Sequence, residues 1–173
     1  MSEKILLKAT LVFPVRDDQV LLAKKVRKIG AGCLNGYGGG VEPGDATLID
    51  AALREFTQET GGLMAKAADL VKVAVVDFHN RTVEGIRFTC RVHVYLLYGL
   101  QGQAKTTEEM ADPAWFSKNA LPLGKLMPAD PYWLPRILAG EFLYVKAWYG
   151  PAQKTLEKAV QVTPVTPNEL DRL

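Results

Sequence analysis

The sequence has 173 residues, the size of one ordinary domain with a single buried core. Apolar residues make up 48% of it and charged residues 23%, which is typical of soluble globular proteins and excludes a disordered chain. The formal net charge of +2 is too small to indicate nucleic acid or a membrane surface as the partner.

The predicted elements follow from hydrophobic periodicity and from turn residues. A glycine-rich loop, IGAGCLNGYGGG, separates the first two strands from the strongest helix pattern. In chain order we expect strands over 4–15 and 19–26, a helix over 48–60, strands over 70–79 and 84–99, a short strand over 113–117, a helix over 130–139, and closing strands over 141–149 and 154–162.

The helix over 48–60 has recognisable ends. Thr47 with Asp50 resembles a capping box, and Gly61 and Gly62 supply the stop. The order of elements indicates an α+β or mixed α/β fold without the regular alternation of a Rossmann sheet. We expect one domain over residues 1–162 and a loosely ordered, proline-containing tail over residues 163–173.

The two cysteines, Cys33 and Cys90, are too few for a disulfide framework or a clustered zinc site. No apolar run reaches the ~18 residues that span a bilayer, and the first residues lack the long apolar stretch of a signal peptide. We therefore expect reduced thiols in a cytoplasmic protein.

The helix carries a possible metal site. Glu55 and Glu59 are four residues apart and share one face, with Gln58 beside them. Two like charges at this spacing destabilise a helix by a few tenths of a kcal/mol. A divalent cation bound between the two carboxylates would make their interaction stabilising. Mg²⁺ typically takes one or two carboxylates, with the remaining ligands from water and substrate phosphates. Taken alone, the pair also fits an ordinary solvated face.

The stretch GGGVEPGDATLIDAALREFTQETGG resembles the Nudix box, G-x5-E-x7-R-E-U-x-E-E-x-G-U, in which U is a bulky aliphatic residue. Starting the motif at Gly39 places Asp45 at its first glutamate, with one extra residue before Arg54. Starting at Gly40 restores the spacing but places Ala46 there. We prefer the first register because it preserves the E-P-G-D turn. Gln58 stands where the motif has a glutamate.

The resemblance to the Nudix hydrolase family implies an α/β/α sandwich with a mixed central β-sheet flanked by helices. It also implies Mg²⁺ as the cofactor, with Mn²⁺ as an alternative. Its ligands would be Glu55, Glu59, Gln58, the Gly38 carbonyl and an acid downstream. Arg54 would orient the glutamates through charge-assisted hydrogen bonds. A glutamine brings no negative charge, so we expect weaker binding of one metal ion.

Segments outside the box resemble the MutT-homologue branch of the family, which hydrolyses oxidised purine nucleoside triphosphates such as 8-oxo-dGTP. These segments are KKVRKIGAGCLNGYGGGVEPGD and EEMADPAWF…LMPADPYWLPRIL. The resemblance implies that Asn35 and Asp130 hold the purine edge. Leu34, Met127 and Ala129 depart from that branch, which has two tryptophans and an acid at these positions. The resemblance therefore predicts the type of reaction more safely than the substrate.

Further positions match that branch's pocket. Thr10 and Phe78 would contact the substrate, although both also suit ordinary strand residues. Lys25 would do so too, or be a solvated charge. In TEEM, Glu109 would bind metal or assist the attacking water, with its neighbour Glu108 as the alternative.

The leading hypothesis is a Mg²⁺-dependent pyrophosphohydrolase that converts a modified purine nucleoside triphosphate to the monophosphate and diphosphate. One alternative is another substrate, such as ADP-ribose or a dinucleotide. The other is a catalytically silent nucleotide-binding module, suggested by Gln58 and Asp45. The partner would be a small-molecule nucleotide, with no nucleic acid and no membrane, and we expect a monomer.

Overall fold

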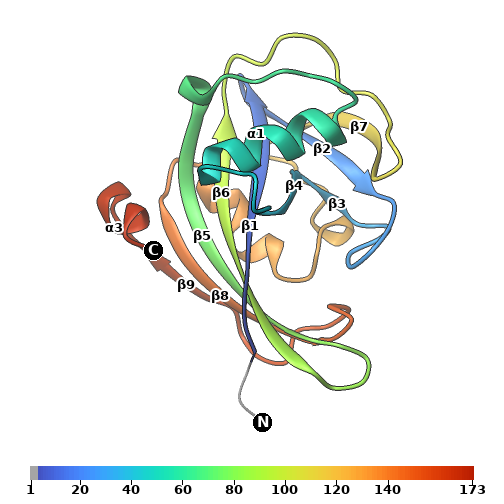
Figure 1. The fold of residues 1–173 in the computed structure, drawn as a ribbon, viewed down its shortest axis with the longest axis vertical. Coiled ribbons are helices and arrows are strands. Elements are labelled where there is room, and N and C mark those ends of the chain that lie inside the picture. The colour runs from blue at the N-terminus through green and yellow to red at the C-terminus, as the bar shows by residue number, and fades with distance from the viewer. Residues whose placement is uncertain (1–3) are drawn as a thin grey trace.

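In the computed structural model, which describes residues 4–173, nine strands form one mixed sheet (Figure 1). The main path of the sheet runs in the order β3-β2-β1-β6-β5-β8-β9, while β4 pairs with β1 and β7 pairs with β2. The strands are β1 Lys4–Arg16, β2 Gln19–Lys25, β3 Leu34–Asn35, β4 Tyr37–Gly40, β5 Leu70–Arg81, β6 Arg87–Leu97, β7 Met110–Ser117, β8 Leu143–Pro151 and β9 Gln161–Pro164.

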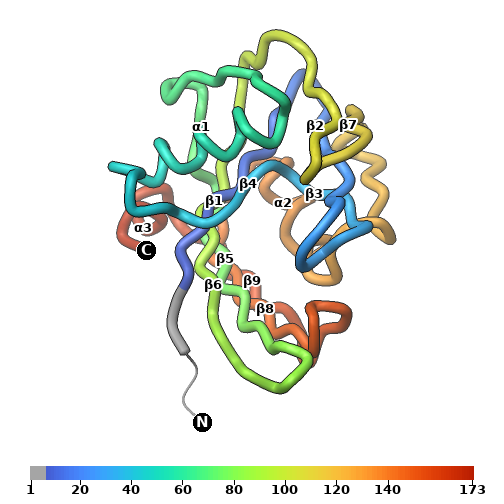
Figure 2. The backbone as a smooth tube through the Cα atoms, turned by 45° about the vertical axis from the view of Figure 1, so that its right-hand side comes forward, coloured from blue at the N-terminus to red at the C-terminus, as the bar shows by residue number. Residues whose placement is uncertain are grey.

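Two α-helices cover opposite faces of the sheet (Figures 1 and 2). On one face, Phe56 of α1 (Leu48–Glu59) packs edge-on against Tyr37, with 5.6 Å between the ring centroids. On the other face, Trp133 precedes α2 (Leu134–Leu138) and packs edge-on against Phe13 at 6.1 Å. All four rings are fully buried. Because successive residues of a strand point to opposite faces, the strands contribute apolar side chains to both layers. The expected sandwich and mixed sheet are confirmed.

The sheet mixes parallel and antiparallel pairs in a way that brings distant segments together. β1 runs parallel to β6 and β5 runs parallel to β8, while β5 and β6 form an antiparallel hairpin. The connection between β5 and β6 lies beside the connection between β8 and β9 at one end of the molecule (Figures 1 and 2). One end of the sheet therefore combines residues from the middle and from the last quarter of the sequence.

Most predicted elements are confirmed, including the helix whose N-cap Thr47 accepts a hydrogen bond from the Asp50 amide. The predicted helix over 130–139 is instead a 3₁₀ turn (Asp130–Tyr132) followed by α2. Part of the glycine-rich loop pairs as β3 and β4. Further 3₁₀ turns lie at Ala67–Asp69 and Leu123–Lys125, and no helix within residues 4–173 is long and apolar enough to cross a bilayer.

The prediction of a strand beginning at residue 154 is wrong, because β9 begins only at Gln161. Ala152 and Gln153 both have φ of 56° and form the turn that follows β8. The returning segment makes an isolated antiparallel bridge between Leu156 and Tyr149 instead of a continuous ladder. Leu156 is partly buried and packs against the cluster formed by Met127, Ala129, Ala147 and Tyr149.

The last residues pack against the sheet, which differs from the expected loose tail. A complete capping box between Thr166 and Glu169 starts α3 (Pro167–Asp171), and Leu170 is fully buried. Lys72 of β5 donates to the Leu170 carbonyl at 3.1 Å, and Arg91 of β6 donates to the Leu173 carbonyl at 3.0 Å. These contacts supply the tertiary support that so short a helix lacks by itself.

Candidate active site

Two glycines let β4 run tightly between β1 and α1. A Cβ atom at Gly38 would lie 1.9 Å from the Thr10 carbonyl oxygen, and one at Gly39 would lie 2.6 Å from Cδ of Glu55. Both distances are far below van der Waals contact, so only glycine fits at Gly38, and a side chain at Gly39 would require the Glu55 carboxylate to move. The strand thereby brings its backbone within hydrogen-bonding reach of the acidic face of the helix.

Arg54 organises the charged groups at this end of α1. Its guanidinium donates to both carboxylate oxygens of Asp45, at 2.9 and 2.8 Å, and to Glu55 at 2.7 Å. It also donates to the Gly40 carbonyl at 3.0 Å. The bidentate hydrogen bond from Arg54 lowers the pKa of Asp45 to about 2. Arg54 thus links the carboxylates of Asp45 and Glu55.

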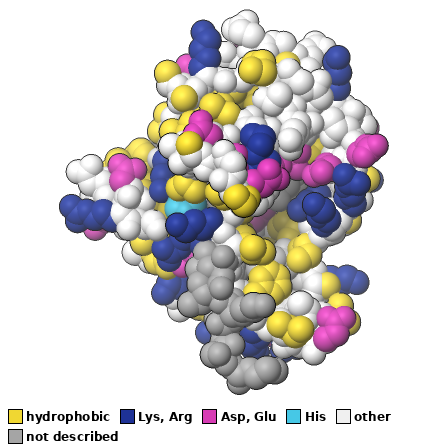
Figure 3. Space-filling model, in the orientation of Figure 1, with side chains coloured by type: hydrophobic (Ala, Val, Ile, Leu, Met, Phe, Trp, Pro, Cys, Tyr) yellow, Lys and Arg dark blue, Asp and Glu magenta, His cyan; other side chains and the backbone are white. Residues whose placement is uncertain are grey.

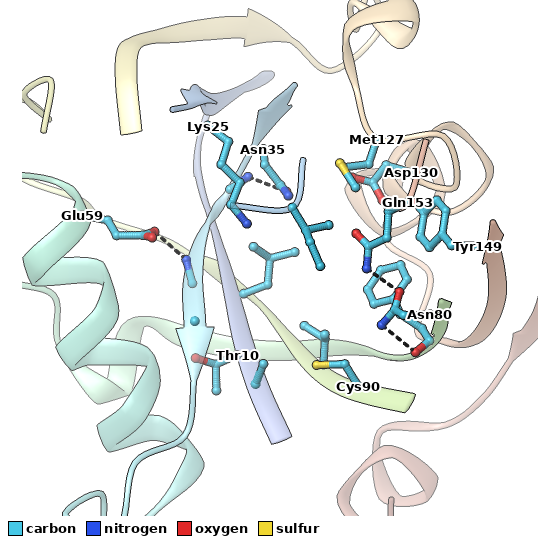
Figure 4. A pocket seen from close by; sticks show the side chains of 18 of the residues that line it. Thr10, Lys25, Asn35, Glu59, Asn80, Cys90, Met127, Asp130, Tyr149 and Gln153 are labelled. Atoms are coloured by element: carbon cyan, nitrogen blue, oxygen red, sulfur yellow. Dashed lines mark hydrogen bonds between the residues drawn. The ribbon is translucent and has the colours of Figure 1, made fainter. Parts of the chain in front are cut away.

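Glu59 is the buried carboxylate of the site, with 5% of its surface exposed. Its Oε2 accepts a hydrogen bond of 2.8 Å from the Gly38 amide (Figure 4). Burial raises the pKa of Glu59 to about 8, and the neighbouring charges of Glu55 and Glu109 act in the same direction. A buried carboxylate next to two others, with one amide as its hydrogen-bond donor, is suited to a cation.

Glu109, and not Glu108, faces this cluster. Glu109 interacts electrostatically with Glu59, whereas the Glu108 side chain is 89% exposed. Arg27, a residue that sequence analysis did not identify, donates to Glu109 at 3.1 Å and lowers the pKa of its carboxyl. Acidic side chains interleaved with lysines and arginines form a band across this face of the molecule (Figure 3).

The oxygen donors of this site fit a hard divalent cation that takes some of its ligands from the protein and the others from a substrate. Within residues 4–173, no three His, Cys, Asp or Glu side chains are already arranged as a complete metal site. Glu55 and Glu59 nevertheless supply the one or two carboxylates that Mg²⁺ usually takes from a protein. Gln58 lies on the exposed side of α1, next to them in the helix.

A single cavity contains every residue predicted to contact the substrate (Figure 4). Glu59 and Gly38 line the end of this cavity next to α1. The predicted contact residues that line it are Thr10, Lys25, Asn35, Phe78, Met127 and Asp130. Glu59 of the acidic cluster and the predicted base pocket therefore share one cavity.

Burial tunes the charged groups within the cavity. Asp130 is 3% exposed, and burial raises the pKa of its carboxyl to about 7. Burial also lowers the pKa of Lys25, although the charge of Glu59 opposes that shift. A carboxyl that is half protonated near neutral pH can either donate or accept a hydrogen bond, which suits the edge of a base.

Three further side chains that sequence analysis missed line the cavity. They are Asn80 at the end of β5, Tyr149 on β8 and Gln153 on the turn after β8. The Tyr149 hydroxyl accepts a hydrogen bond of 3.0 Å from the Ala129 amide, and its ring stacks on Phe78 at 5.8 Å. These segments come together because β5 pairs in parallel with β8, and no local sequence pattern predicts that pairing.

Comparison with known proteins agrees with this geometry. The family description "NUDIX domain" matches residues 6–137. The chain is 36% identical to an oxidized purine nucleoside triphosphate hydrolase of Mus musculus and 33% identical to that of Danio rerio, in each case over 129 residues, covering 75% of this chain and 78% of the relative. A crystal structure of a MutT protein from Bacillus halodurans superposes with a TM-score of 0.71 at 22% identity, covering 90% of this chain and 97% of that one.

Proposed function

The chain belongs to the NUDIX family and is a pyrophosphohydrolase, and we propose that its substrate is an oxidised purine nucleoside triphosphate such as 8-oxo-dGTP. The products would be the nucleoside monophosphate and diphosphate, which removes the modified nucleotide from the precursor pool. The names of the two vertebrate relatives support this substrate class.

One observation carries the proposal: Glu59 of the acidic cluster lines the same cavity as the apolar residues of the proposed base pocket. Glu59 lies at one end, while Met127 and Tyr149 lie toward the other, and Phe78 stacks on Tyr149. A nucleoside triphosphate has the matching polarity, because its phosphates require cations and its base requires apolar surface and a few hydrogen bonds. Its scissile phosphates would lie beside Glu59 while its base fills the pocket.

The metal site is part of the proposal. We assign the ion as Mg²⁺, held by Glu55, Glu59, Gln58 and the Gly38 carbonyl, with Glu109 as a further ligand or as the group that assists the attacking water. When bound, a divalent cation gathers charge on the diphosphate oxygens and lowers the pKa of a coordinated water. Arg54 would orient Glu55 through its 2.7 Å hydrogen bond, and Arg27 would orient Glu109 through its hydrogen bond of 3.1 Å.

Binding of the base would use the remaining residues of the cavity. Asn35 and Asp130 would hydrogen-bond the purine edge, while Phe78 and Met127 would cover its faces; Thr10 and Lys25 would line the path toward the phosphates. We further propose that the protein acts in the cytoplasm as a monomer, which gel filtration coupled to light scattering would test.

A substrate panel tests the proposed function. Purified protein is incubated with 8-oxo-dGTP, 2-hydroxy-dATP, dGTP or ADP-ribose in Mg²⁺, and diphosphate and monophosphate are quantified. We expect the highest kcat/KM with an oxidised purine triphosphate, loss of turnover in EDTA, and recovery on adding Mg²⁺ or Mn²⁺. Preference for ADP-ribose would overturn the substrate class. Nucleotide binding without turnover at millimolar Mg²⁺ would overturn the enzymatic assignment.

A further inference from the structure

A chain of two side-chain amides lines the cavity on the side away from α1. Asn80 Nδ2 donates to the Phe78 carbonyl at 3.1 Å, and Gln153 Nε2 donates to Asn80 Oδ1 in a short hydrogen bond (Figure 4). Asn80 is 2% exposed. Nothing in the proposed chemistry at the acidic cluster requires these two amides, so their place in the cavity calls for another role.

The backbone around Gln153 is held in a conformation that non-glycine residues avoid. Ala152 and Gln153 both have φ of 56°, a left-handed conformation that is unfavourable for residues with a Cβ atom. The turn is fixed from both sides: the Ala152 amide donates to the Arg81 carbonyl at 3.0 Å, and the Gly150 amide donates to the Thr155 carbonyl at 2.8 Å. The result is a rigid turn that points Gln153 into the cavity.

The hydrogen bonds determine which atom of Gln153 faces the ligand. A backbone carbonyl only accepts, so the Asn80 atom that contacts the Phe78 carbonyl must be its NH₂ group. Asn80 Oδ1 is then the acceptor for Gln153, which must offer its own NH₂ group. Gln153 Oε1 consequently remains available as an acceptor, and it points into the cavity toward Met127 and Asp130 (Figure 4).

The amide of Asn35 is fixed with the opposite polarity. Its Oδ1 accepts a hydrogen bond of 2.8 Å from the Gly36 amide, so its NH₂ group remains to donate to a ligand. The cavity therefore presents a fixed donor at Asn35 and a fixed acceptor at Gln153, both away from Glu59. A base that bears a carbonyl oxygen and an exocyclic amino group matches this pair.

We propose that Gln153 is a specificity-determining residue whose Oε1 accepts a hydrogen bond from an exocyclic amino group of the purine base, and that Asn80 is the positioning residue that orients it. This inference rests on the proposed function, because it concerns the base of that substrate. Purines that carry an exocyclic amino group are preferred over otherwise identical purines that lack it.

The test compares substrates that differ by one amino group. The first pair is 8-oxo-dGTP and 8-oxo-dITP, and the second is dATP and the triphosphate of unsubstituted purine deoxyriboside. Gln153→Asn shortens the side chain while keeping a residue that tolerates the left-handed conformation, so the fold is preserved. Gln153→Leu removes the acceptor. We expect both variants to reduce kcat/KM about 3- to 10-fold for the amino-bearing member of at least one pair, and to change its partner less than about 2-fold.

Asn80 is tested by Asn80→Leu, which removes the group that orients Gln153. We expect the same selective loss for the amino-bearing base, with kcat retained for the partner that lacks the amino group. Gln161→Asn, an exposed glutamine on β9, is the matched control and should change neither substrate.

The outcomes separate the two proposals. If the wild-type protein turns over no nucleoside triphosphate, the proposed function fails. If it turns over these substrates but Gln153→Asn and Gln153→Leu leave the preference within each pair unchanged, or reduce all four substrates equally, the role of Gln153 is overturned while the proposed function stands.

Discussion

The two ends of the cavity are built in different ways. The acidic end comes mainly from one continuous stretch, from Gly38 to Glu59, and its groups interact through charge and backbone contact. The base end is assembled from the 3₁₀ turn at Asp130, from β5 and from the turn after β8, which lie far apart in the sequence. The comparison teaches that the residues proposed to break the bond come from a local stretch, whereas those proposed to select the base are brought together by tertiary pairing.

The largest expected effect is at the acidic end. Glu59→Gln should lower kcat/KM by about 10³-fold or more, because a metal ion contributes several kcal/mol of transition-state charge stabilisation. Glu59 is buried with a pKa of about 8, so at pH 8 without metal the neutral variant should unfold at the same or a higher temperature. Turnover and thermal unfolding are measured together, with exposed Glu84→Gln as the control. Full activity in Glu59→Gln would contradict the metal assignment.

Arg54→Lys probes whether this end depends on geometry as well as charge. A lysine keeps the charge but cannot bind both oxygens of Asp45 while also reaching Glu55. We expect kcat/KM to fall by about 10- to 100-fold, the range seen when a group supporting a metal ligand is altered. Arg172→Lys, at an exposed position, serves as the control. Wild-type rates in Arg54→Lys would mean that charge alone suffices.

At the base end the prediction concerns how the free energy of unfolding depends on pH. Asp130 has a pKa of about 7 in the folded protein, above its ordinary value of 3.8. Between these values the folded state holds a proton that the unfolded state has released, so this carboxyl makes the free energy of unfolding decrease as pH rises from about 4 to about 7.

Asp130→Asn should remove that contribution, so its free energy of unfolding should depend less on pH than that of the wild type. Urea unfolding at pH 5 and pH 7 measures the difference, which we expect to exceed about 1.4 kcal/mol, the equivalent of one pKa unit. Asp18→Asn, at an exposed turn, should retain the wild-type pH dependence. An unchanged slope in Asp130→Asn would show that the carboxyl is ionised in the folded state.

The smallest expected effect is at Gln58. Gln58→Glu adds a carboxylate next to the assigned metal ligands, and ligand charge tunes affinity for such cations. We expect the Mg²⁺ concentration for half-maximal activity to fall by about 2- to 5-fold, with the rate at saturating Mg²⁺ unchanged. Gln101→Glu, at an exposed position elsewhere, should leave the Mg²⁺ dependence as it was. No change in Gln58→Glu would exclude residue 58 from the metal site.

The same contrast explains what the sequence could predict. The helix over 48–60 was predictable because its cap, its apolar stripe and its acidic pair are all patterns of residues that lie close together in the sequence. Thr10, Lys25, Asn35, Phe78, Met127 and Asp130 line one cavity, but family resemblance indicated them, not spacing.

Other residues were out of reach of local patterns. Asn80 and Gln153 meet only because β5 pairs in parallel with β8, a long-range contact. The packing of Leu170 likewise depends on a sheet face that is formed by β5. Apolar residues near Leu156 suggested a strand, but Leu156 makes an isolated bridge with Tyr149 and the regular pairing of β9 with β8 begins at Gln161.

The two glycines of β4 have different consequences for the evolution of the protein. At Gly38 the obstacle to any side chain is the Thr10 backbone, which no second substitution can remove. At Gly39 the obstacle is the Glu55 carboxylate, so an alanine there would become tolerable once Glu55 were shortened. The second route exists sterically, but it removes a proposed metal ligand. We therefore expect epistasis to link positions 39 and 55. Substitution of Gly38 is prevented by the fold, whereas substitution of Gly39 is prevented by the need to keep the Glu55 carboxylate for the proposed reaction.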